Sequence, residues 1–304
     1  MQIQAPRVGR PRVVTPEVEE DILQRFEDNP QTSSRAIGNT LDVRHPRVLR
    51  VAKENGLRPF HLQKVQKLQP EDFQRRINFA NFVINQVEID EDFLSKIIFT
   101  DEARFTRDGK FNIHINHLWS DNNPHGTFVQ GHQQRFSVNV WAGMIGSFLI
   151  GPYILPHRLN GRMYLRFLQE VLPGLLEEVP PEVRNNMWYQ HDGAPPHNLL
   201  AVQDHLHQNF PGRWIGTGGP VPWPARSPDF NPKDFFFWGR MNELIYDGSE
   251  IVSEEDLVAR IAAAAGEVRD SAATVFPTVY DSLLRRCHLC LRADVKGRNF
   301  EQYL

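Results

Sequence analysis

The chain has 304 residues, enough for one large domain or two of ordinary size. Its 40% hydrophobic and 23% charged residues exclude collagen-like and disordered chains, and its two cysteines exclude a disulfide-stapled secreted scaffold. The net charge of −3 hides an asymmetry, because residues 1–70 carry +4 and the remainder carries −7. A basic segment on an acidic body indicates that the N-terminal part meets a polyanion.

The first 14 residues form an extended arm rich in proline and arginine, without the apolar stretch of a secretory signal. The arm contains the short run GRPR, with Arg10 and Arg12. Arginines in an extended segment can enter the minor groove of A·T-rich DNA. Four residues of this kind are weak evidence by themselves, and they gain weight from the pattern that follows them.

Residues 15–58 predict three short helices and hence a helix-turn-helix domain. Thr15 before Pro16 marks the start of the first helix, and Asn29-Pro30 marks its end. Thr32 or Ser33 caps the second helix, and a tight turn leads into the third at about residues 45–54. Three short helices with a tight turn before the last are typical of DNA-binding modules.

The third helix carries a basic face. Val48, Leu49, Val51 and Ala52 are expected on its inward side, and the basic residues recur every three positions: Arg44, Arg47, Arg50 and Lys53. Such a face is often only solvated. Residues 29–70, however, contain 8 basic and 2 acidic residues, which favours contact with DNA phosphates.

Residues 59–70 are predicted to be a linker, and residues 71–304 a catalytic domain. A helix is expected over 71–86, with an apolar face formed by Phe73, Ile77, Ala80 and Ile84. An α/β pattern follows, with strands at 97–100, 111–115, 136–142, 148–154, 187–191 and 213–215, and helices at 163–178, 197–208 and 232–246. This order predicts a mixed sheet flanked by helices.

Residues 136–156 contain no charge over 21 positions, long enough to cross a bilayer. Their content favours a buried β-hairpin instead. Apolar residues alternate with others from Phe136 to Trp141, and Gly146-Ser147 is a turn signal between two β-rich runs. We therefore expect no membrane segment here.

Two acids follow strand-like runs, Asp101 after IIFT and Asp192 after MWYQH. In open α/β sheets ligands bind at the carboxyl ends of the strands. Asp234 and Asp229, both in SPDFNPKDFFFW, compete for a third place. Carboxylates that converge repel each other unless cations neutralise them, and hard oxygen ligands favour Mg²⁺ or Mn²⁺. On spacing alone, the favoured interpretation of each acid is a helix cap or a solvated loop residue.

Three segments carry a resemblance to a known family. TDEARF (100–105), HDGAPPH (191–197) and WPARSPDFNPKDFFFWG (223–239) resemble the three acidic motifs of mariner-like DDE/D transposases, and GRPR beside a helix-turn-helix is also a feature of that family. The resemblance covers the chain from about residue 9. It implies a ribonuclease-H-like catalytic domain whose metal-binding acids are Asp101, Asp192 and Asp234, with Asp234 favoured over Asp229 because it follows the Asn-Pro pair.

The resemblance also implies a mechanism and partners. Two divalent ions, Mg²⁺ or Mn²⁺, would bind about 3.5–4 Å apart and assist hydrolysis of a phosphodiester, after which the freed 3′-OH attacks target DNA. The partners would be double-stranded DNA with terminal inverted repeats, a TA target site and a second copy of the chain. The expected location is the nucleus of a eukaryotic host. His191 and His197 flank the second acid and either contact DNA, orient a ligand or serve the structure.

Two departures from the family pattern stand out. Family members usually carry two helix-turn-helix units with GRPR between them, so the first unit is expected to be missing here. The gap between Asp192 and Asp234 is 41 residues, longer than in many mariner relatives. The extra length falls in the Pro/Gly-rich loop 211–228, which is either a partner-contacting insert or slack.

Cys287 and Cys290 stand in a CxxC spacing, but no second pair completes a structural zinc site, and a helix with both cysteines one turn apart is the better interpretation.

The sequence leaves three possible functions. The first is an active metal-dependent transposase, favoured by its intact acids. The second is a truncated or domesticated derivative that binds DNA without transposing. The third is an unrelated metal-dependent phosphohydrolase with an accessory helical domain, which the motif set disfavours.

Overall fold

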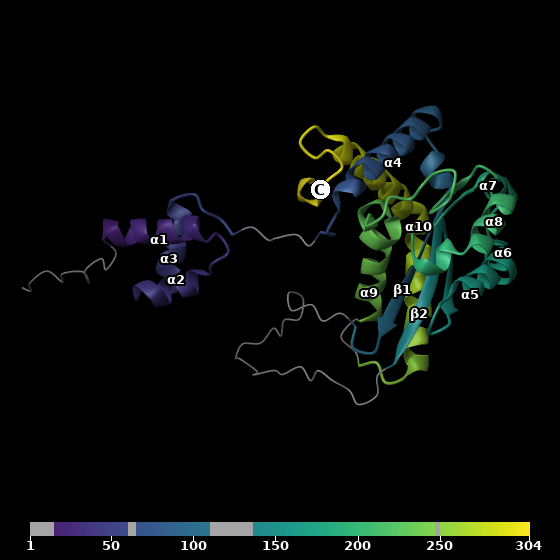
Figure 1. Cartoon of the computed structure of the whole chain (residues 1–304). Helices are drawn as coiled ribbons and strands as arrows, with labels where there is room; N and C mark the ends of the chain where they lie inside the picture. Colours follow the sequence, from purple (N-terminus) through teal and green to yellow (C-terminus); the bar gives the residue numbers. More distant parts are fainter. Residues whose placement is uncertain (1–14, 60–64, 110–135, 247–249) are drawn as a thin grey trace, which may run out of the picture. The chain divides into compact units, whose positions relative to one another are not determined.

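The computed structural model describes residues 15–59, 65–109, 136–246 and 250–304 (Figure 1). The chain divides into two compact units, Met1–Gln63 and Lys64–Leu304. The predicted arm with Arg10 and Arg12, and the strand predicted at 111–115, lie outside the described residues. Each unit is treated by itself below.

The N-terminal unit contains the three predicted helices, α1 (Pro16–Asp28), α2 (Ser34–Leu41) and α3 (His45–Glu54). The Oγ of Ser33 accepts a hydrogen bond from the backbone N–H of Ala36 and so caps α2. Asp42 ends α2 in the left-handed region, at φ 51°, and turns the chain toward α3. A small core holds the unit together, and it consists of Ile22, Ile37, Val48 and Val51. The expectation for Leu49 was wrong, because its side chain is 46% exposed.

The larger unit is built on one five-stranded mixed sheet, with strand order β3-β2-β1-β4-β5. Its strands are β1 (Ile97–Thr106), β2 (Ser137–Ile145), β3 (Phe148–Leu155), β4 (Trp188–Gln190) and β5 (Trp214–Ile215). The first three are antiparallel neighbours, and β4 and β5 add parallel to β1. The predicted hairpin is confirmed, since Ile145 pairs with Phe148 across the turn at Gly146.

Helices cover both faces of the sheet (Figure 1). One face packs against α4 (Pro70–Ile89), α9 (Trp238–Ile245) and the long α10 (Glu254–Leu291). The other face packs against α5 (Gly161–Arg166), α6 (Leu172–Leu175) and α8 (Leu200–Asn209), while the short α7 (Pro181–Asn186) precedes β4. The expected mixed sheet flanked by helices is therefore confirmed.

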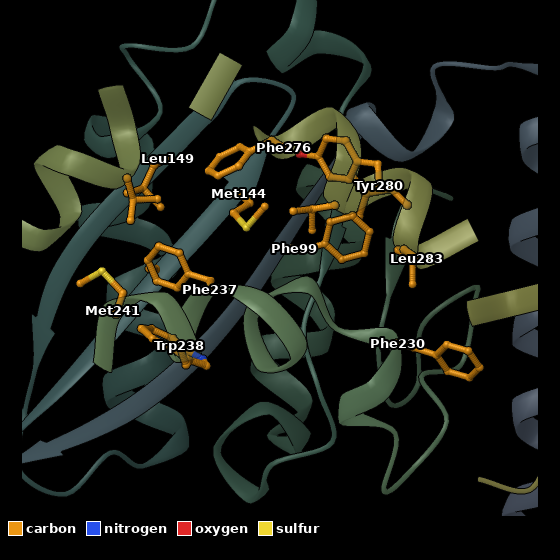
Figure 2. Close-up of a cluster of buried hydrophobic side chains, with 14 of the residues drawn as sticks. Phe99, Met144, Leu149, Phe230, Phe237, Trp238, Met241, Phe276, Tyr280 and Leu283 are labelled. Atoms are coloured by element: carbon orange, nitrogen blue, oxygen red, sulfur yellow. The ribbon is translucent and has the colours of Figure 1, made fainter. Parts of the chain in front are cut away.

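The core on the α10 side joins strand residues to both C-terminal helices. Figure 2 shows Phe99 and Met144 from the sheet among Phe237, Trp238, Phe276 and Tyr280 from the helices. The aromatic run after Asp234 supplies Phe237 and Trp238, which are buried, whereas Phe235 and Phe236 are half-buried. Burial of this run fixes the segment that carries Asp234 against β1.

Two predicted elements differ from the structure in instructive ways. β1 continues to Thr106, so Asp101 lies in the middle of a strand and not after its end. The buried face of α4 is rotated from the predicted one. Ala80 is buried as predicted, and so are Asp72, Arg76 and Phe79, which were not predicted. Phe73, Ile77 and Ile84 of the predicted face are only half-buried. Charged residues can face the interior when they are paired, and periodicity of apolar residues does not reveal them.

The π-helical turns at Phe167–Val171 and Lys233–Phe237 interrupt the two helices predicted at 163–178 and 232–246. In the described part of the chain, no helix combines the length and the apolar character needed to cross a membrane. The second π-turn contains Asp234, and π-turns inside helices are frequent at functional sites.

Candidate active site

Asp101 and Asp192 come together at one edge of the sheet. In the parallel pairing of β1 and β4, Phe99 stands opposite Gln190. Asp101 follows Phe99 by two residues, and Asp192 follows Gln190, the last residue of β4, by two. The charge of Asp192 acts on Asp101, so the two carboxylates lie near each other. The β4–β1 pairing was not visible in the sequence.

Asp234 approaches Asp101 from the other side, on the π-turn that precedes α9. Trp238, four residues further along, donates a hydrogen bond from its indole Nε1 to Oδ2 of Asp101 at 2.7 Å. The ring of Trp238 also packs edge-on against Phe105 of β1, with centroids 6.0 Å apart. These contacts fix the π-turn on β1 and orient the Asp101 carboxylate.

The electrostatics of Asp101 show that negative charge gathers here. Burial raises the pKa of the Asp101 carboxyl well above its ordinary value, and the charges of Asp234 and Glu102 raise it further. The hydrogen bond from Trp238 acts in the opposite direction but does not outweigh them. A cation bound near these carboxylates would relieve the repulsion.

Lys233 contributes a buried amine next to the acids. Its side chain is fully buried, and its Nζ lies 3.4 Å from the centroid of the Phe237 ring, without a hydrogen-bond partner. Burial lowers the pKa of Lys233 well below its ordinary value, although the charges of Asp101 and Asp234 act to raise it. The sequence did not predict the burial of Lys233, because a lysine next to an aspartate is typical of an exposed pair of charges.

His197 joins Asp192 to Glu102. Its Nδ1 lies 2.9 Å from Oδ1 of Asp192, and its Nε2 lies 3.4 Å from Oε1 of Glu102. The backbone N–H of Ala194 also donates to Oδ1 of Asp192 at 2.9 Å. The ring of His197 is 1% exposed and stacks on the parallel ring of His191 at 4.6 Å. Both histidines that flank Asp192 are thus buried.

The charges in this group shift two pKa values. Burial favours the neutral form of His197, but the Glu102 charge and hydrogen bonding to Asp192 outweigh it and raise the pKa of His197 to about 10. Burial likewise opposes ionisation of Asp192, but hydrogen bonding to His197 keeps the pKa of Asp192 below its ordinary value. Asp192 is therefore ionised at neutral pH.

The three predicted acids do not form one tight cluster. Within the described residues, the group whose ligand atoms all lie within 4.8 Å of one another consists of Glu102, Asp192 and His197. Asp101 instead faces Trp238 and is close enough to Asp234 for their charges to interact. Sequence reasoning missed Glu102, because alternation along a strand puts it on the face opposite Asp101.

Asp229 has a different environment from Asp234. Its carboxylate makes two hydrogen bonds to the guanidinium of Arg76 on α4, of 2.7 and 2.5 Å, and both side chains are buried. Arg76 also donates to Oγ of Ser227 and to the carbonyl of Gly297. Asp229 is thus held in an ion pair that links α4, the loop before Asp234 and the C-terminal segment.

The loop 211–228 is anchored to this unit along much of its length. Trp214 and Trp223 are buried, and Arg226 donates two hydrogen bonds of 2.6 Å to the buried Asp72 on α4. These contacts do not support the expectation that the loop is slack. The other possibility, a contact to a partner, stays a prediction.

The predicted DNA-binding residues on α3 differ in exposure. Arg44, Arg50 and Lys53 are exposed, whereas Arg47 is half-buried. Arg50 also lies 3.6 Å from Glu54, one turn further along the helix. Cys287 and Cys290 are buried on α10 with free thiols, and among the described residues they join no metal-ligand group.

The raised pKa of Asp101 predicts how stability depends on pH without metal. A folded-state pKa above the unfolded one lowers stability as pH rises through the interval between the two values. We expect Asp101→Asn to raise the Tm in the presence of a chelator, with a gain over wild type that grows as the pH is raised above the ordinary aspartate pKa. A difference of about 1 kcal/mol would appear as about 2–4 °C for a unit of this size. A difference that stays flat with pH would contradict this.

Solved structures of other proteins share the architecture of this chain. The Mos1 transposase paired-end complex with left transposon end has a TM-score of 0.71 and 19% sequence identity, and covers 99% of this chain and 84% of its own. The mariner Mos1 paired end complex with Mg gives 0.72 and 18%, with the same coverage. The chain has the Mos1 transposase fold. The catalytic domain of Mos1 mariner transposase, matched by itself, gives 0.57 and 20%, and covers 79% of this chain and all of its own.

No known protein-family model matches this sequence, and no curated protein sequence is a detectable relative. The structural likeness therefore rests on the fold, and it includes the N-terminal helices, since it extends over nearly the whole chain. It confirms the predicted ribonuclease-H-like class and the resemblance to mariner transposases at the level of the fold.

Proposed function

We propose that this protein is a mariner-like DNA transposase that uses divalent metal ions to cut DNA at the ends of its element and to join the freed 3′-OH to a TA target. The observation that carries the proposal is that the charges of Asp234 and Asp192 both act on Asp101, in a Mos1-like fold and from three motifs in the family's order. The proposal includes action on paired DNA ends, as in the Mos1 structures that are described as paired-end complexes. It also includes a homodimer and a nuclear location in a eukaryotic host.

The residues present fit a divalent cation. Burial raises the pKa of Asp101, and the charges of Asp234 and Glu102 raise it further, so a bound cation would stabilise the ionised carboxylate. Carboxylate oxygens are the donors that Mg²⁺ and Mn²⁺ favour. Asp101, Asp192 and Asp234 would hold these ions, which are of the kind named in the Mos1 complexes with Mn and Mg. When bound, such ions supply Lewis-acid activation of the phosphodiester.

The protein's own groups supply orientation. Trp238 holds Oδ2 of Asp101, and the Ala194 N–H together with His197 holds Oδ1 of Asp192. Packing of Phe237 and Trp238 in the core keeps Asp234 on the same edge. Preorganised carboxylates avoid the cost of reorienting during the reaction. The basic residues of α3 would contact DNA phosphates and bring the substrate to the protein.

The direct test is metal-dependent nicking. The full chain is incubated with a supercoiled plasmid that carries the genomic sequences flanking the coding region. We expect nicking with Mg²⁺ or Mn²⁺, none with a chelator, and none by Asp192→Asn. Equal nicking by wild type and Asp192→Asn would refute the catalytic assignment. DNA binding without nicking under any metal would favour the alternative of a non-transposing derivative.

Salt dependence tests the DNA-binding role of α3. Each phosphate contact that is lost reduces the slope of log K against log salt by about 0.9 for duplex DNA. We therefore expect Arg44→Ala to flatten the slope by about that amount. The matched control is Arg25→Ala, which removes an exposed arginine from α1. If both variants change the slope equally, α3 is not the DNA-contacting helix.

A further inference from the structure

One side-chain amide joins an arginine of β1 to the loop that follows β3. Nε of Arg104 donates a hydrogen bond of 3.0 Å to Oδ1 of Asn139, its cross-strand partner on β2. Nδ2 of Asn139 donates to the backbone carbonyls of Pro156 and His157, at 3.0 and 2.9 Å. Asn139 therefore fixes both the guanidinium of Arg104 and the start of the loop 156–160.

Arg104 lies on the same face of the sheet as Glu102. Side chains two positions apart along a strand point to the same face. Glu102 stands opposite Trp141 of β2, which belongs to the core on the α5 side of the sheet. Arg104 therefore lies on the face that α5 covers (Figure 1).

The same face carries the part of the proposed active site around Asp192. Oε1 of Glu102 lies 3.4 Å from Nε2 of His197, and the other ring nitrogen of His197 lies 2.9 Å from Oδ1 of Asp192. The loop 156–160 leads into α5, and Tyr164 of α5 packs on the His197 ring with centroids 4.2 Å apart. β1 and the loop therefore both adjoin the residues around Asp192.

The positive charge of Arg104 is not used inside the described part of the chain. Its side chain is exposed, and within those residues it forms no ion pair and donates a hydrogen bond from Nε alone. Glu102, on the same face, pairs with His197 instead. Arg158, the residue after His157 in the loop, is also exposed and forms no ion pair with any described residue. A guanidinium that is held through Nε presents its other two nitrogens as a fork, and that fork matches the oxygens of a phosphate.

We propose that Arg104 and Arg158 form a phosphate clamp that holds the backbone of the DNA strand cut at the proposed active site. Acids that bind metal ions repel a polyanion, so positive charge beside them favours its approach. Phosphate contacts of this kind position DNA without reading its sequence. The inference rests on the proposed function for the identity of the strand, whereas DNA binding by the two arginines does not depend on cleavage.

Binding is measured on the full chain with Mg²⁺ and a fluorescent duplex that carries the genomic sequence flanking the coding region, before cleavage is detectable. Log K is followed against log salt, and each phosphate contact that is lost reduces the slope by about 0.9. We expect Arg104→Ala and Arg158→Ala each to reduce the slope by about that amount, and the double variant by about twice as much. A wild-type slope in either single variant would overturn the clamp.

Two further variants separate a phosphate contact from a general effect of charge or folding. Arg75→Ala is the matched control, because it removes an exposed arginine from α4, which covers the opposite face of the sheet. It should keep the wild-type slope, and a slope as flat as that of Arg104→Ala would overturn the clamp. Circular dichroism verifies folding. If Arg104→Ala misfolds, Arg104→Gln decides, because it removes the charge and keeps an amide donor for Asn139.

Nicking separates the clamp from the proposed function. At sub-saturating plasmid, Arg104→Ala and Arg158→Ala should nick more slowly than the wild type, and more DNA should restore the rate, because loss of uniform binding raises KM and leaves kcat unchanged. If the wild type shows the arginine-dependent slope but nicks no DNA under any metal, the clamp stands and the proposed function fails. If nicking proceeds and both variants keep the wild-type slope, the proposed function stands and the clamp fails. If the wild type binds no duplex, both fail.

Discussion

Asp234→Asn is expected to reduce metal-dependent nicking by more than about a hundredfold while leaving the protein folded. Loss of an outer partner of a metal ligand already costs about 10–100-fold, so loss of a ligand should cost more. Stability should be unchanged or improved, because the charge of Asp234 raises the pKa of Asp101 through repulsion that the amide removes. Rates are measured on supercoiled plasmid at saturating Mg²⁺, and Tm is measured with and without metal.

Asp270→Asn is the matched control, because it makes the same chemical change at an exposed position on α10. It should nick like the wild type. If Asp234→Asn retains most of the wild-type rate, Asp234 is not the third acid. In that case the site must draw its third carboxylate from elsewhere, and Glu102, which lies near Asp192, is the next candidate to replace.

The sequence predicted most elements of this fold, and where it failed the reason is physical. The hairpin around Gly146-Ser147 was predictable, since turn and strand signals are local. The end of β1 was misplaced, because Asp101 and Glu102 were read as the close of a strand, although the strand continues to Thr106. Aspartate, and to a lesser degree glutamate, is depleted in strands, so local rules end the strand at this pair. The error therefore falls at the proposed active site, where local rules are most often broken.

The part of the site that could not be predicted depends on contacts distant in sequence. His197 reaches Glu102 only because β4 lies beside β1, and no local pattern specifies that pairing. The buried face of α4 was predicted only in part, for a similar reason. Arg76 is charged, so a periodicity of apolar residues does not place it on the buried face. Its burial becomes favourable only because it pairs with Asp229, which lies 153 positions further along the chain. Long-range pairing of charges is invisible to a helical periodicity.

The second prediction concerns the buried ion pair between Arg76 and Asp229. Asp229→Asn is expected to destabilise the protein by about 3–5 kcal/mol, because it leaves a buried guanidinium without its counter-charge. Such a loss corresponds to a fall in Tm of roughly 6–20 °C for a unit of this size. Both side chains are almost completely buried, at 0% and 5% exposure, so solvent cannot take the place of the missing carboxylate. Urea and thermal unfolding with the metal-free chain measure the effect.

Glu243→Gln is the matched control, since it breaks the exposed pair with Arg240 on α9. Exposed pairs contribute about 0–1 kcal/mol, so this variant should unfold near the wild-type midpoint. Arg76→Met combined with Asp229→Asn should recover stability relative to Asp229→Asn alone, because no unpaired buried charge then remains. A loss below about 1 kcal/mol for Asp229→Asn would mean that Arg76 finds sufficient partners in Ser227 and the Gly297 carbonyl.

Asp229→Asn and Asp234→Asn are expected to have opposite effects: the first lowers stability and the second lowers activity. The two acids are five positions apart in one motif and were rivals for one role, yet one is paired with arginine and the other lies near Asp101. An ion pair at Asp229 that anchors the loop to α4 also fixes the start of the π-turn that carries Asp234. Asp229→Asn should therefore lower nicking only because part of the protein is unfolded or the loop is displaced. Conditions that stabilise the fold, such as low temperature, should restore the nicking activity. Asp234→Asn should stay inactive under every condition in which it is folded.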